Sequence, residues 1–536
     1  MREFLTTISD ETRKIDVNVR DSFAMCLFTE RSMFRRELLE LAAASASLTL
    51  TRALDNPLRI LSAAGRRVAS RMLAATDRAP LVLPPVVRPD DLVLTARARM
   101  VEIAPGMRVE AWSTGDGPVG PTIRTRTGDI ARIRLENALA EPTILHWHGL
   151  RVPEAADGHP RLAIAPGAGY AYEFPVIDRA GTYWYHAHPH HRTGIQAYRG
   201  MAGLLLVGDA AEDALGLPQG DFEIPLLIQD RRIGNDGTFV YEPVMHEQME
   251  GFFGDTPFGN GIRLPSLSVA TTMYRLRIVN GTTSRILRLA LSNGQAMTLI
   301  GNDGGLLPAA VSVRSVDLGT GERADLLVDF SRLAVGSQVA LLSAAFESPA
   351  RMGGMGGMGM GRGMMGMGRM GAGGVPQGGE LRLVEFEVTR ATKAETWRPA
   401  PLPEIARLDP ARATRTRTFR FASAMMQHSI NGRTFDMSRI DETVRFGDTE
   451  IWTFINDSPF PHPVHMHEVQ FQVIERTGGR GRVLPWESGY KDTVLVFPGE
   501  RVSVIAEFDR YRGRFLMHCH NLVHEDMGMM LNYEIV

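Results

Sequence analysis

The chain has 536 residues, of which 44% are hydrophobic and 22% are charged, and its net charge is -2 at pH 7. This length exceeds what one hydrophobic core usually organises, so we expect several folded domains. The nearly neutral charge excludes a strongly basic surface of the kind that binds nucleic acid or an anionic membrane. Only two cysteines occur, Cys26 and Cys519, so disulfide bonds are not expected to stabilise the fold.

Residues 1–80 differ from the rest of the chain, because they hold basic clusters and an Ala/Ser/Leu run without strand alternation. Arg35 and Arg36 precede the apolar run 41–50, an arrangement that resembles a twin-arginine export signal. We therefore expect an exported, periplasmic protein, and a cytoplasmic protein with an amphipathic leader is the alternative. No other segment offers the ~18 uninterrupted apolar residues of a membrane-spanning helix, so stable membrane insertion is not expected.

From about residue 86 onward, short alternating runs such as 131–135 and 502–506 are bounded by Gly, Pro, Asn and Asp. In a strand, successive side chains point to opposite faces, so this alternation is typical of half-buried β-strands. The pattern predicts an all-β fold for the chain beyond the leader.

Two distant parts of the chain share one order of landmark residues. Gly-Asp, Asn and His-x-His in residues 128–148 recur at the same offsets in residues 447–467. A third copy lies between them, because Gly321-Glu-Arg323 and Phe330 match the spacing of residues 499–508, yet this copy has no His-x-His. Such repeats predict three Greek-key β-sandwich domains in tandem. The domains are predicted at residues 86–212, 220–390 and 412–536.

Four motifs hold ten of the fifteen histidines. They are His146-Trp-His148, His186-Ala-His188, His462-Pro-Val-His465-Met-His467, and His518-Cys-His520 with His524 and Met529. Residues two apart in a strand project to the same face, so each His-x-His pair presents two imidazoles toward one site. Four such pairs in two matched domains predict a metal cluster between the first and third domains. Imidazole binds zinc, copper, iron and nickel alike, so the histidines alone do not select the metal.

Cys519 selects the metal. Its two flanking histidines share one face of the strand, so the cysteine points to the other face. There His462, His524 and a weak axial Met529 complete the His, His and Cys set of a blue-copper electron-transfer centre. The backbone of Cys519 joins this centre to both flanking histidines, so the sequence predicts two metal sites that exchange electrons along the chain.

These motifs resemble the four copper signatures of the three-domain multicopper oxidases, the family of laccases and bacterial cuprous oxidases, from about Val86 to the C-terminus. The resemblance implies three cupredoxin-like domains, four copper ions, and one-electron oxidation of a small reducing substrate coupled to four-electron reduction of dioxygen to water. It assigns His146 and His465 to a type 2 ion, His148, His186, His188, His467, His518 and His520 to a type 3 pair, and His462, Cys519, His524 and Met529 to a type 1 ion. No ligand position is missing, in contrast to copperless members of the same fold.

A low-complexity run at residues 352–370 bears on the substrate. Its eight methionines are separated mainly by glycine, and they are Met352, Met355, Met358, Met360, Met364, Met365, Met367 and Met370. Thioether sulfur is a soft ligand that selects Cu(I), and cuprous oxidases of the family are similar in carrying a methionine-rich insert here. Just before the type 1 histidine, where those enzymes place an acidic and a methionine ligand for the substrate copper, this chain offers Asp457, slightly out of register. Asp436 and Met437 are the alternative pair.

We therefore favour Cu(I) as the substrate. Laccase-like oxidation of phenols and aromatic amines is the first alternative. A copper-sequestering protein without significant turnover is the alternative from another class. We expect the protein to be a monomer.

Reduction of dioxygen also needs four protons, which metal ligands do not supply. Glu525 directly follows His524, and Asp157 lies just beyond the first motif. Both correspond to acidic positions implicated in the family, so we predict that they relay protons. Asp492 is interpreted as a residue that orients a loop or a ligand, and it is not predicted to be catalytic.

Overall fold

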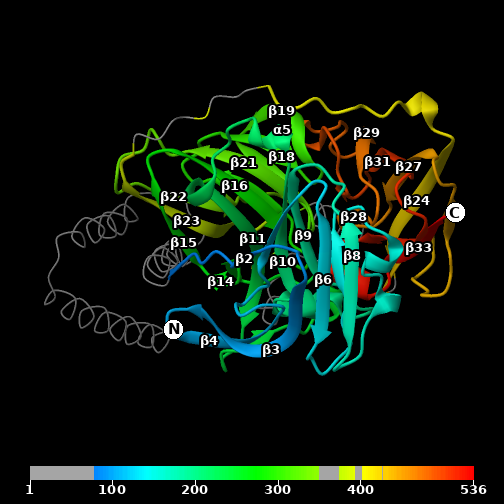
Figure 1. The fold of residues 1–536 in the computed structure, drawn as a ribbon, viewed down its shortest axis with the longest axis horizontal. Coiled ribbons are helices and arrows are strands. Elements are labelled where there is room, and N and C mark those ends of the chain that lie inside the picture. The colour runs from blue at the N-terminus through cyan, green and yellow to red at the C-terminus, as the bar shows by residue number, and fades with distance from the viewer. Residues whose placement is uncertain (1–77, 349–373, 393–396, 398–400, 425) are drawn as a thin grey trace, which may run out of the picture. The chain divides into compact units, whose positions relative to one another are not determined.

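The computed structural model describes residues 78–348, 374–392, 397, 401–424 and 426–536. Residues 1–77 of the leader predicted at 1–80, and the predicted methionine-rich insert at 352–370, lie outside the described residues. Residues 79 and 80 were wrongly included in the leader, because they pair with the second sandwich. In the described part of residues 78–536, six β-sheets form three pairs, and each pair encloses a hydrophobic core (Figure 1). The prediction of an all-β fold with three sandwiches in tandem is confirmed.

The first sandwich is built from strands β2 to β10. Its strands are β2 Val86–Val87, β3 Leu92–Ala104, β4 Met107–Ser113, β5 Thr122–Arg126, β6 Ile130–Asn137, β7 Leu145–His148, β8 Gly169–Pro175, β9 Gly181–Ala187 and β10 Ala202–Gly208. One sheet has the order β4-β3-β6-β8 and the other β2-β5-β10-β9-β7. In β6 the expected alternation is present, because Ile133 and Leu135 are buried while Arg132 and Arg134 are exposed.

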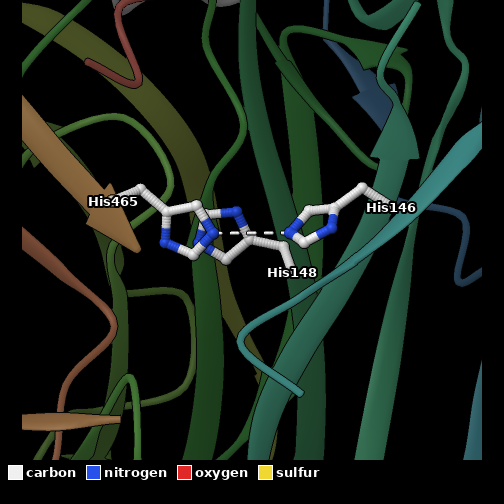
Figure 2. Close-up of side chains that lie close together, drawn as sticks. All are labelled: His146, His148 and His465. Carbon is white, nitrogen blue, oxygen red and sulfur yellow. Dashed lines mark hydrogen bonds between the residues drawn. The ribbon is translucent and has the colours of Figure 1, made fainter. Parts of the chain in front are cut away.

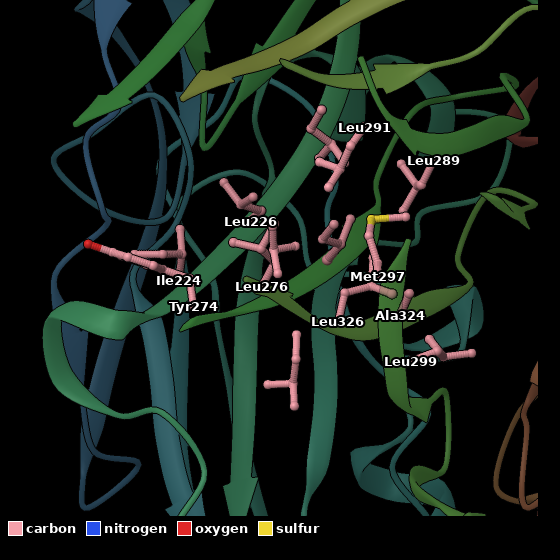
Figure 3. Packing of buried hydrophobic residues seen from close by; sticks show 14 of the residues in the cluster. Ile224, Leu226, Tyr274, Leu276, Leu289, Leu291, Met297, Leu299, Ala324 and Leu326 are labelled. Atoms are coloured by element: carbon pink, nitrogen blue, oxygen red, sulfur yellow. The ribbon is translucent and has the colours of Figure 1, made fainter. Parts of the chain in front are cut away.

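The second sandwich follows and is the largest. Its strands are β11 Glu223–Ile233, β12 Phe239–Val240, β13 Thr256–Gly259, β14 Ile262–Arg263, β15 Pro265–Ala270, β16 Met273–Asn280, β17 Leu287–Leu291, β18 Met297–Asn302, β19 Gly305–Val313, β20 Ser315–Leu318, β21 Arg323–Asp329, β22 Gln338–Ser343 and β23 Leu381–Arg390. Strand β1, Ala79–Pro80, pairs in parallel with β15 at the edge of this sandwich. Leu226, Leu276 and Leu326 of neighbouring strands meet in its core (Figure 3).

The third sandwich completes the chain. Its strands are β24 Arg415–Ala424, β25 Gln427–Ile430, β26 Glu442–Val444, β27 Thr449–Asn456, β28 His462–Met466, β29 Phe471–Thr477, β30 Thr493–Val496, β31 Arg501–Glu507, β32 Gly513–Cys519 and β33 Met530–Ile535. The sheets have the orders β25-β24-β27-β31-β29 and β26-β33-β32-β28-β30. In β31, Val502, Val504 and Ala506 enter the core, while Ser503 on the other face contacts Thr453 at 3.1 Å.

Short helices lie between the strands, and those described are α4 Thr193–Arg199, α5 Ala210–Asp213, α6 Met245–Glu250 and α7 Leu522–Asp526. Single 3-10 turns lie at Glu154–Ala156, Pro160–Leu162, Gly220–Phe222, Pro410–Arg412 and Pro485–Glu487. Asp526 at the end of α7 accepts hydrogen bonds from the backbone of Thr193 and Gly194 at the start of α4, both at 2.9 Å, which joins the first and third sandwiches. Within the described ranges, none of the helices has the length and apolar character needed to cross a membrane.

Candidate metal centre

The His-x-His motifs lie on paired antiparallel strands. His146 on β7 is opposite His186 on β9, and His465 on β28 is opposite His518 on β32. The ten motif histidines and Cys519 are at most 1% exposed. Burial, together with neighbouring imidazoles, lowers the pKa of His146 well below its ordinary value, so its ring is neutral and keeps one nitrogen lone pair.

The orientation of His146 and His465 shows where their lone pairs point. Nδ1 of His146 donates to the Asp157 carbonyl oxygen at 2.7 Å, and Nδ1 of His465 donates to the Asp492 carbonyl oxygen at 2.9 Å. A carbonyl oxygen only accepts, so each Nδ1 carries the proton and each Nε2 carries the lone pair. The two Nε2 atoms face each other at 3.4 Å (Figure 2). Two facing lone pairs repel each other unless a cation lies between them.

The other six cluster histidines form two groups of three, and in each group one ring nitrogen from every member lies within 4.8 Å of the others. The groups are His148, His186 and His520, and His188, His467 and His518. Nε2 of His186 faces Nε2 of His520 at 3.4 Å, and Nε2 of His518 lies 3.4 Å from Nε2 of His188 and 3.1 Å from that of His467. The predicted type 3 set is thus divided into two separate clusters, each with neutral donors suited to one metal ion.

Cys519 points away from both clusters, as the strand alternation predicts. Its Sγ lies 3.3 Å from Nδ1 of His462 and 3.7 Å from Nδ1 of His524. Nε2 of His524 donates to the Met249 carbonyl oxygen at 3.0 Å, so Nδ1 of His524 carries the lone pair that faces the sulfur. Met529 is fully buried in the same apolar cluster as Cys519. Two imidazole nitrogens and one sulfur in a buried triangle fit copper.

Asp157 and Glu525 both lie beside the histidine clusters. Oδ2 of Asp157 accepts from Nδ1 of His467 at 2.8 Å, so this carboxylate orients a predicted ligand. Glu525 places Oε1 3.5 Å from Nε2 of His188 and Oε2 3.1 Å from Nδ1 of His518. Burial raises the pKa of both carboxyl groups, most strongly for Asp157. Both positions suit the predicted handling of protons, which stays a prediction.

Asp492 contacts two predicted copper ligands. Oδ1 of Asp492 accepts from Nε2 of His148 at 3.1 Å, and its carbonyl holds His465. Burial alone would raise the pKa of Asp492, but the Arg323 guanidinium and His148 outweigh it and hold this pKa well below its ordinary value. The ionised carboxylate therefore fixes the orientation of His148, which agrees with the interpretation of Asp492 as an orienting residue.

The middle sandwich, which has no His-x-His, still reaches the cluster. Arg323 at the start of β21 is fully buried, forms an ion pair with Asp492, and donates to that residue's Oδ1 at 2.7 Å. A side chain on Gly321, whose φ is +85°, would lie only 2.9 Å from Cε1 of His148 and 3.0 Å from Cδ2 of His520. This role of Arg323 and Gly321 was not predicted from the sequence. The recurring Gly-Glu-Arg of the third repeat was the signal that pointed to it.

The cysteine centre is closed on its outer side. Nε2 of His462 lies 2.6 Å from the Ser458 hydroxyl, and Nε2 of His524 is held by the Met249 carbonyl. His428 stacks on the His524 ring with centroids 4.0 Å apart. The outer nitrogen of each predicted type 1 histidine is therefore occupied by another part of this chain. Sequence patterns did not indicate this closure.

Asp457 directly precedes Ser458, whose hydroxyl contacts His462, but the side chain of Asp457 is 45% exposed and pairs with Arg420 at 2.7 Å. Its predicted role as a ligand for substrate copper stays a prediction. The eight predicted ligands of the methionine-rich insert lie outside the described residues. Trp147, between His146 and His148, packs in the core against Tyr172, Phe174 and Tyr185.

Comparison with known proteins gives one consistent result. Models of the multicopper oxidase family match residues 95–212 and 401–536. A laccase of Bacillus stratosphericus is 30% identical over 489 residues, which cover 79% of this chain and 90% of that protein. The cell division protein FtsP of Escherichia coli strain K12 is 32% identical over 437 residues, which cover 79% of this chain and 85% of that protein.

Among solved structures, the McoA multicopper oxidase from the hyperthermophile Aquifex aeolicus is similar, with a TM-score of 0.76 and 32% identity. The match covers 85% of this chain and 99% of that chain. The three sandwiches are therefore cupredoxin-like, as predicted. The chain belongs to the multicopper oxidase family, and it is a copper-dependent oxidoreductase that uses dioxygen as its electron acceptor.

Proposed function

We propose that this chain binds four copper ions at the residues that the motifs single out. His146 and His465 hold the type 2 ion, and His148, His186 and His520 hold one type 3 ion. The other type 3 ion lies among His188, His467 and His518, and the type 1 ion among His462, Cys519, His524 and Met529. The observation that carries this proposal is the convergence of buried imidazole lone pairs, because a cation relieves their repulsion.

When bound, copper supplies one-electron redox chemistry at the cysteine centre and reduction of dioxygen at the histidine cluster. The protein joins the two sites through Cys519, whose neighbours in the chain are His518 and His520. Asp157 and Asp492 orient cluster histidines through their carboxylates and backbone carbonyls. Glu525 holds a proton at a carboxyl oxygen close to His188 and passes it toward the cluster.

Among reducing substrates we favour Cu(I). The observation that supports this choice is the covered His524, whose ring is fully buried and whose Nε2 is occupied by the Met249 carbonyl. A phenol therefore has no free imidazole nitrogen to hydrogen-bond at this centre. A cuprous ion can transfer its electron through the Met249 carbonyl that covers His524, so it needs no hydrogen bond to the imidazole.

Two other functions are kept as alternatives. The laccase relatives favour oxidation of phenols and aromatic amines. The relative named cell division protein FtsP is not named as an enzyme, so a role without turnover is kept. Copper sequestration is the form of that alternative that the sequence left open. The complete set of buried donors argues against the second alternative, since sequestration does not need two linked sites.

Oxygen uptake separates these functions. Copper-loaded protein is given Cu(I) or a phenol in parallel, and we expect a clearly higher kcat/KM with Cu(I). A preference for the phenol would establish the laccase-like alternative. Copper binding without oxygen uptake on either substrate would establish sequestration.

We also propose that the protein is exported by the twin-arginine route and acts as a monomer in the periplasm. The arginine pair before residues 41–50 supports export of a folded, copper-loaded protein. Replacing Arg35 and Arg36 by lysine should retain the protein in the cytoplasm in a fractionation experiment. Unchanged export of that variant would contradict the proposed route.

A further inference from the structure

We propose that helix α6 carries a docking site for the cuprous substrate, formed by the thioethers of Met245 and Met249 with the imidazole of His246. The same helix passes the electron inward through the Met249 carbonyl. This inference rests on the proposed function, because it names the place where Cu(I) binds before oxidation.

Helix α6 covers the cysteine centre with the carbonyl groups at its C-terminal end. The last carbonyls of a helix have no partner inside the helix, so other donors must satisfy them. Here the Gln248 carbonyl accepts from Nε2 of His428 at 2.9 Å, and the Met249 carbonyl accepts from Nε2 of His524 at 3.0 Å. The Glu250 carbonyl accepts from Nδ2 of Asn521 at 3.3 Å. Three successive carbonyls thus fix the helix over His524.

The N-terminal half of α6 is held by a buried ion pair. Glu247 is 3% exposed and pairs with Arg232. Its Oε2 also accepts from the backbone N–H of Val244 at 3.0 Å, which closes the first turn of the helix. Since both ends of α6 are anchored, its remaining face is presented to solvent in a defined position.

That remaining face carries soft ligands. Met245 is 70% exposed, more than any other large hydrophobic residue in the described part of the chain. Met249 follows one turn later on the same side of the helix and is half-buried, and His246 beside them is exposed. The exposed thioether of Met245 gains little from burial, so packing does not explain it. Two thioethers with one imidazole prefer Cu(I) to harder cations.

Few bonds separate this site from the cysteine centre. Met249 contributes both a thioether to the site and the carbonyl that accepts from His524, so one residue and one hydrogen bond join them. His524 in turn places Nδ1 3.7 Å from Sγ of Cys519.

Each Cu(I) loses one electron along this path and becomes Cu(II), which prefers nitrogen and oxygen ligands and therefore leaves the thioethers. Four Cu(I) ions supply the four electrons that, with four protons, reduce one dioxygen to two water molecules.

The test compares the double variant M245L/M249L with the control M100L/M107L. Leucine conserves the side-chain volume and removes the sulfur. Met100 is 52% exposed and Met107 is half-buried, and both lie on the β3–β4 hairpin of the first sandwich. The control thus removes the same number of accessible thioethers elsewhere.

Two readouts are taken on copper-loaded full-length protein. In calorimetric titration with Ag(I), a soft cation that is not oxidised, M245L/M249L should bind one ion fewer than wild type while the control binds the same number. With Cu(I) as substrate, KM of M245L/M249L should rise about tenfold or more. Its rate with Cu(I) relative to its rate with a phenol should fall, while the control M100L/M107L keeps the wild-type ratio and the wild-type blue absorbance.

Failure of the inference can be distinguished from failure of the proposed function. Wild-type protein that takes up oxygen with phenols but not with Cu(I) would overturn the proposed substrate. Wild-type protein that oxidises Cu(I), combined with an unchanged KM or an unchanged Ag(I) stoichiometry in M245L/M249L, would overturn the docking site alone.

Discussion

Arg323 lies in the second sandwich, which contributes no predicted copper ligand. Its substitution by glutamine should nevertheless weaken copper binding at the histidine cluster. The guanidinium donates to Asp492, to the Thr182 carbonyl at 3.0 Å and to the Asp303 carbonyl at 2.9 Å. Removing one partner of a buried ion pair costs about 3–5 kcal/mol, because the other charge stays buried without compensation. In Arg323→Gln the uncompensated charge is the Asp492 carboxylate, which accepts a hydrogen bond from His148. We therefore expect both a loss of stability and a loss of copper.

The control is Arg275→Gln, which breaks a buried ion pair of the same sandwich. Arg275 pairs with Asp325 and Glu212, and none of its recorded partners is a predicted copper ligand. Urea unfolding should give a comparable loss of stability for the two variants. Copper content and the type 2 signal in electron paramagnetic resonance should change only in Arg323→Gln. Wild-type copper content and an unchanged type 2 signal in Arg323→Gln would refute the reasoning, whatever the loss of stability.

Three further predictions follow. Glu525→Gln should slow reoxidation of the reduced enzyme by dioxygen by about tenfold or more, and it should leave substrate-driven bleaching of the blue absorbance unchanged. A reoxidation rate equal to that of wild type in stopped-flow experiments would remove Glu525 from the proton path. Burial would raise the pKa of Glu223, but Arg277 and Arg124 outweigh it and lower this pKa to about 2. The depressed pKa contributes about 3 kcal/mol of stability above pH 4.5, and this stability is lost as pH falls toward 2. In Glu223→Gln the free energy of unfolding should therefore depend less on pH between 4.5 and 2. The same pH dependence as in wild type would contradict this. Deleting residues 352–370 should lower the rate with Cu(I) and leave phenol oxidation equal or faster, whereas equal loss on both substrates would indicate a role in folding.

The convergence of the motif histidines and Cys519 was predictable because its signal is local. In His146-Trp-His148 and in His518-Cys-His520, strand geometry alone decides which side chains share a face, and neighbours in the chain stay neighbours in space. The repeats gave the three sandwiches for the same reason, since each copy carries its own turns and strands. For the six histidines predicted for the type 3 pair, strand geometry did not show how they divide into two groups of three.

The residues that hold and cover the ligands were harder to predict. Arg323 reaches Asp492 across 169 positions of sequence, and a buried arginine looks like any other in a strand pattern. The cover over His524 uses a backbone carbonyl of Met249, and every residue has such a group. The contact of Ser458 with His462 could not be predicted, because a serine four residues before a histidine has no distinctive spacing. The contacts of Arg323 and of the Met249 carbonyl depend on how whole domains pack against each other.

The most direct test of the account is the copper content of wild-type protein and of Cys519→Ser, measured together with the visible absorbance. Wild-type protein should hold about four copper ions per chain, with the intense blue absorbance of a thiolate-bound copper. Cys519→Ser should hold about three and be colourless, because the lone pairs of His146 and His465 are oriented by Asp157 and Asp492 and not by the cysteine. A blue Cys519→Ser protein, or the same copper content in both proteins, would contradict the assignment of the two sites.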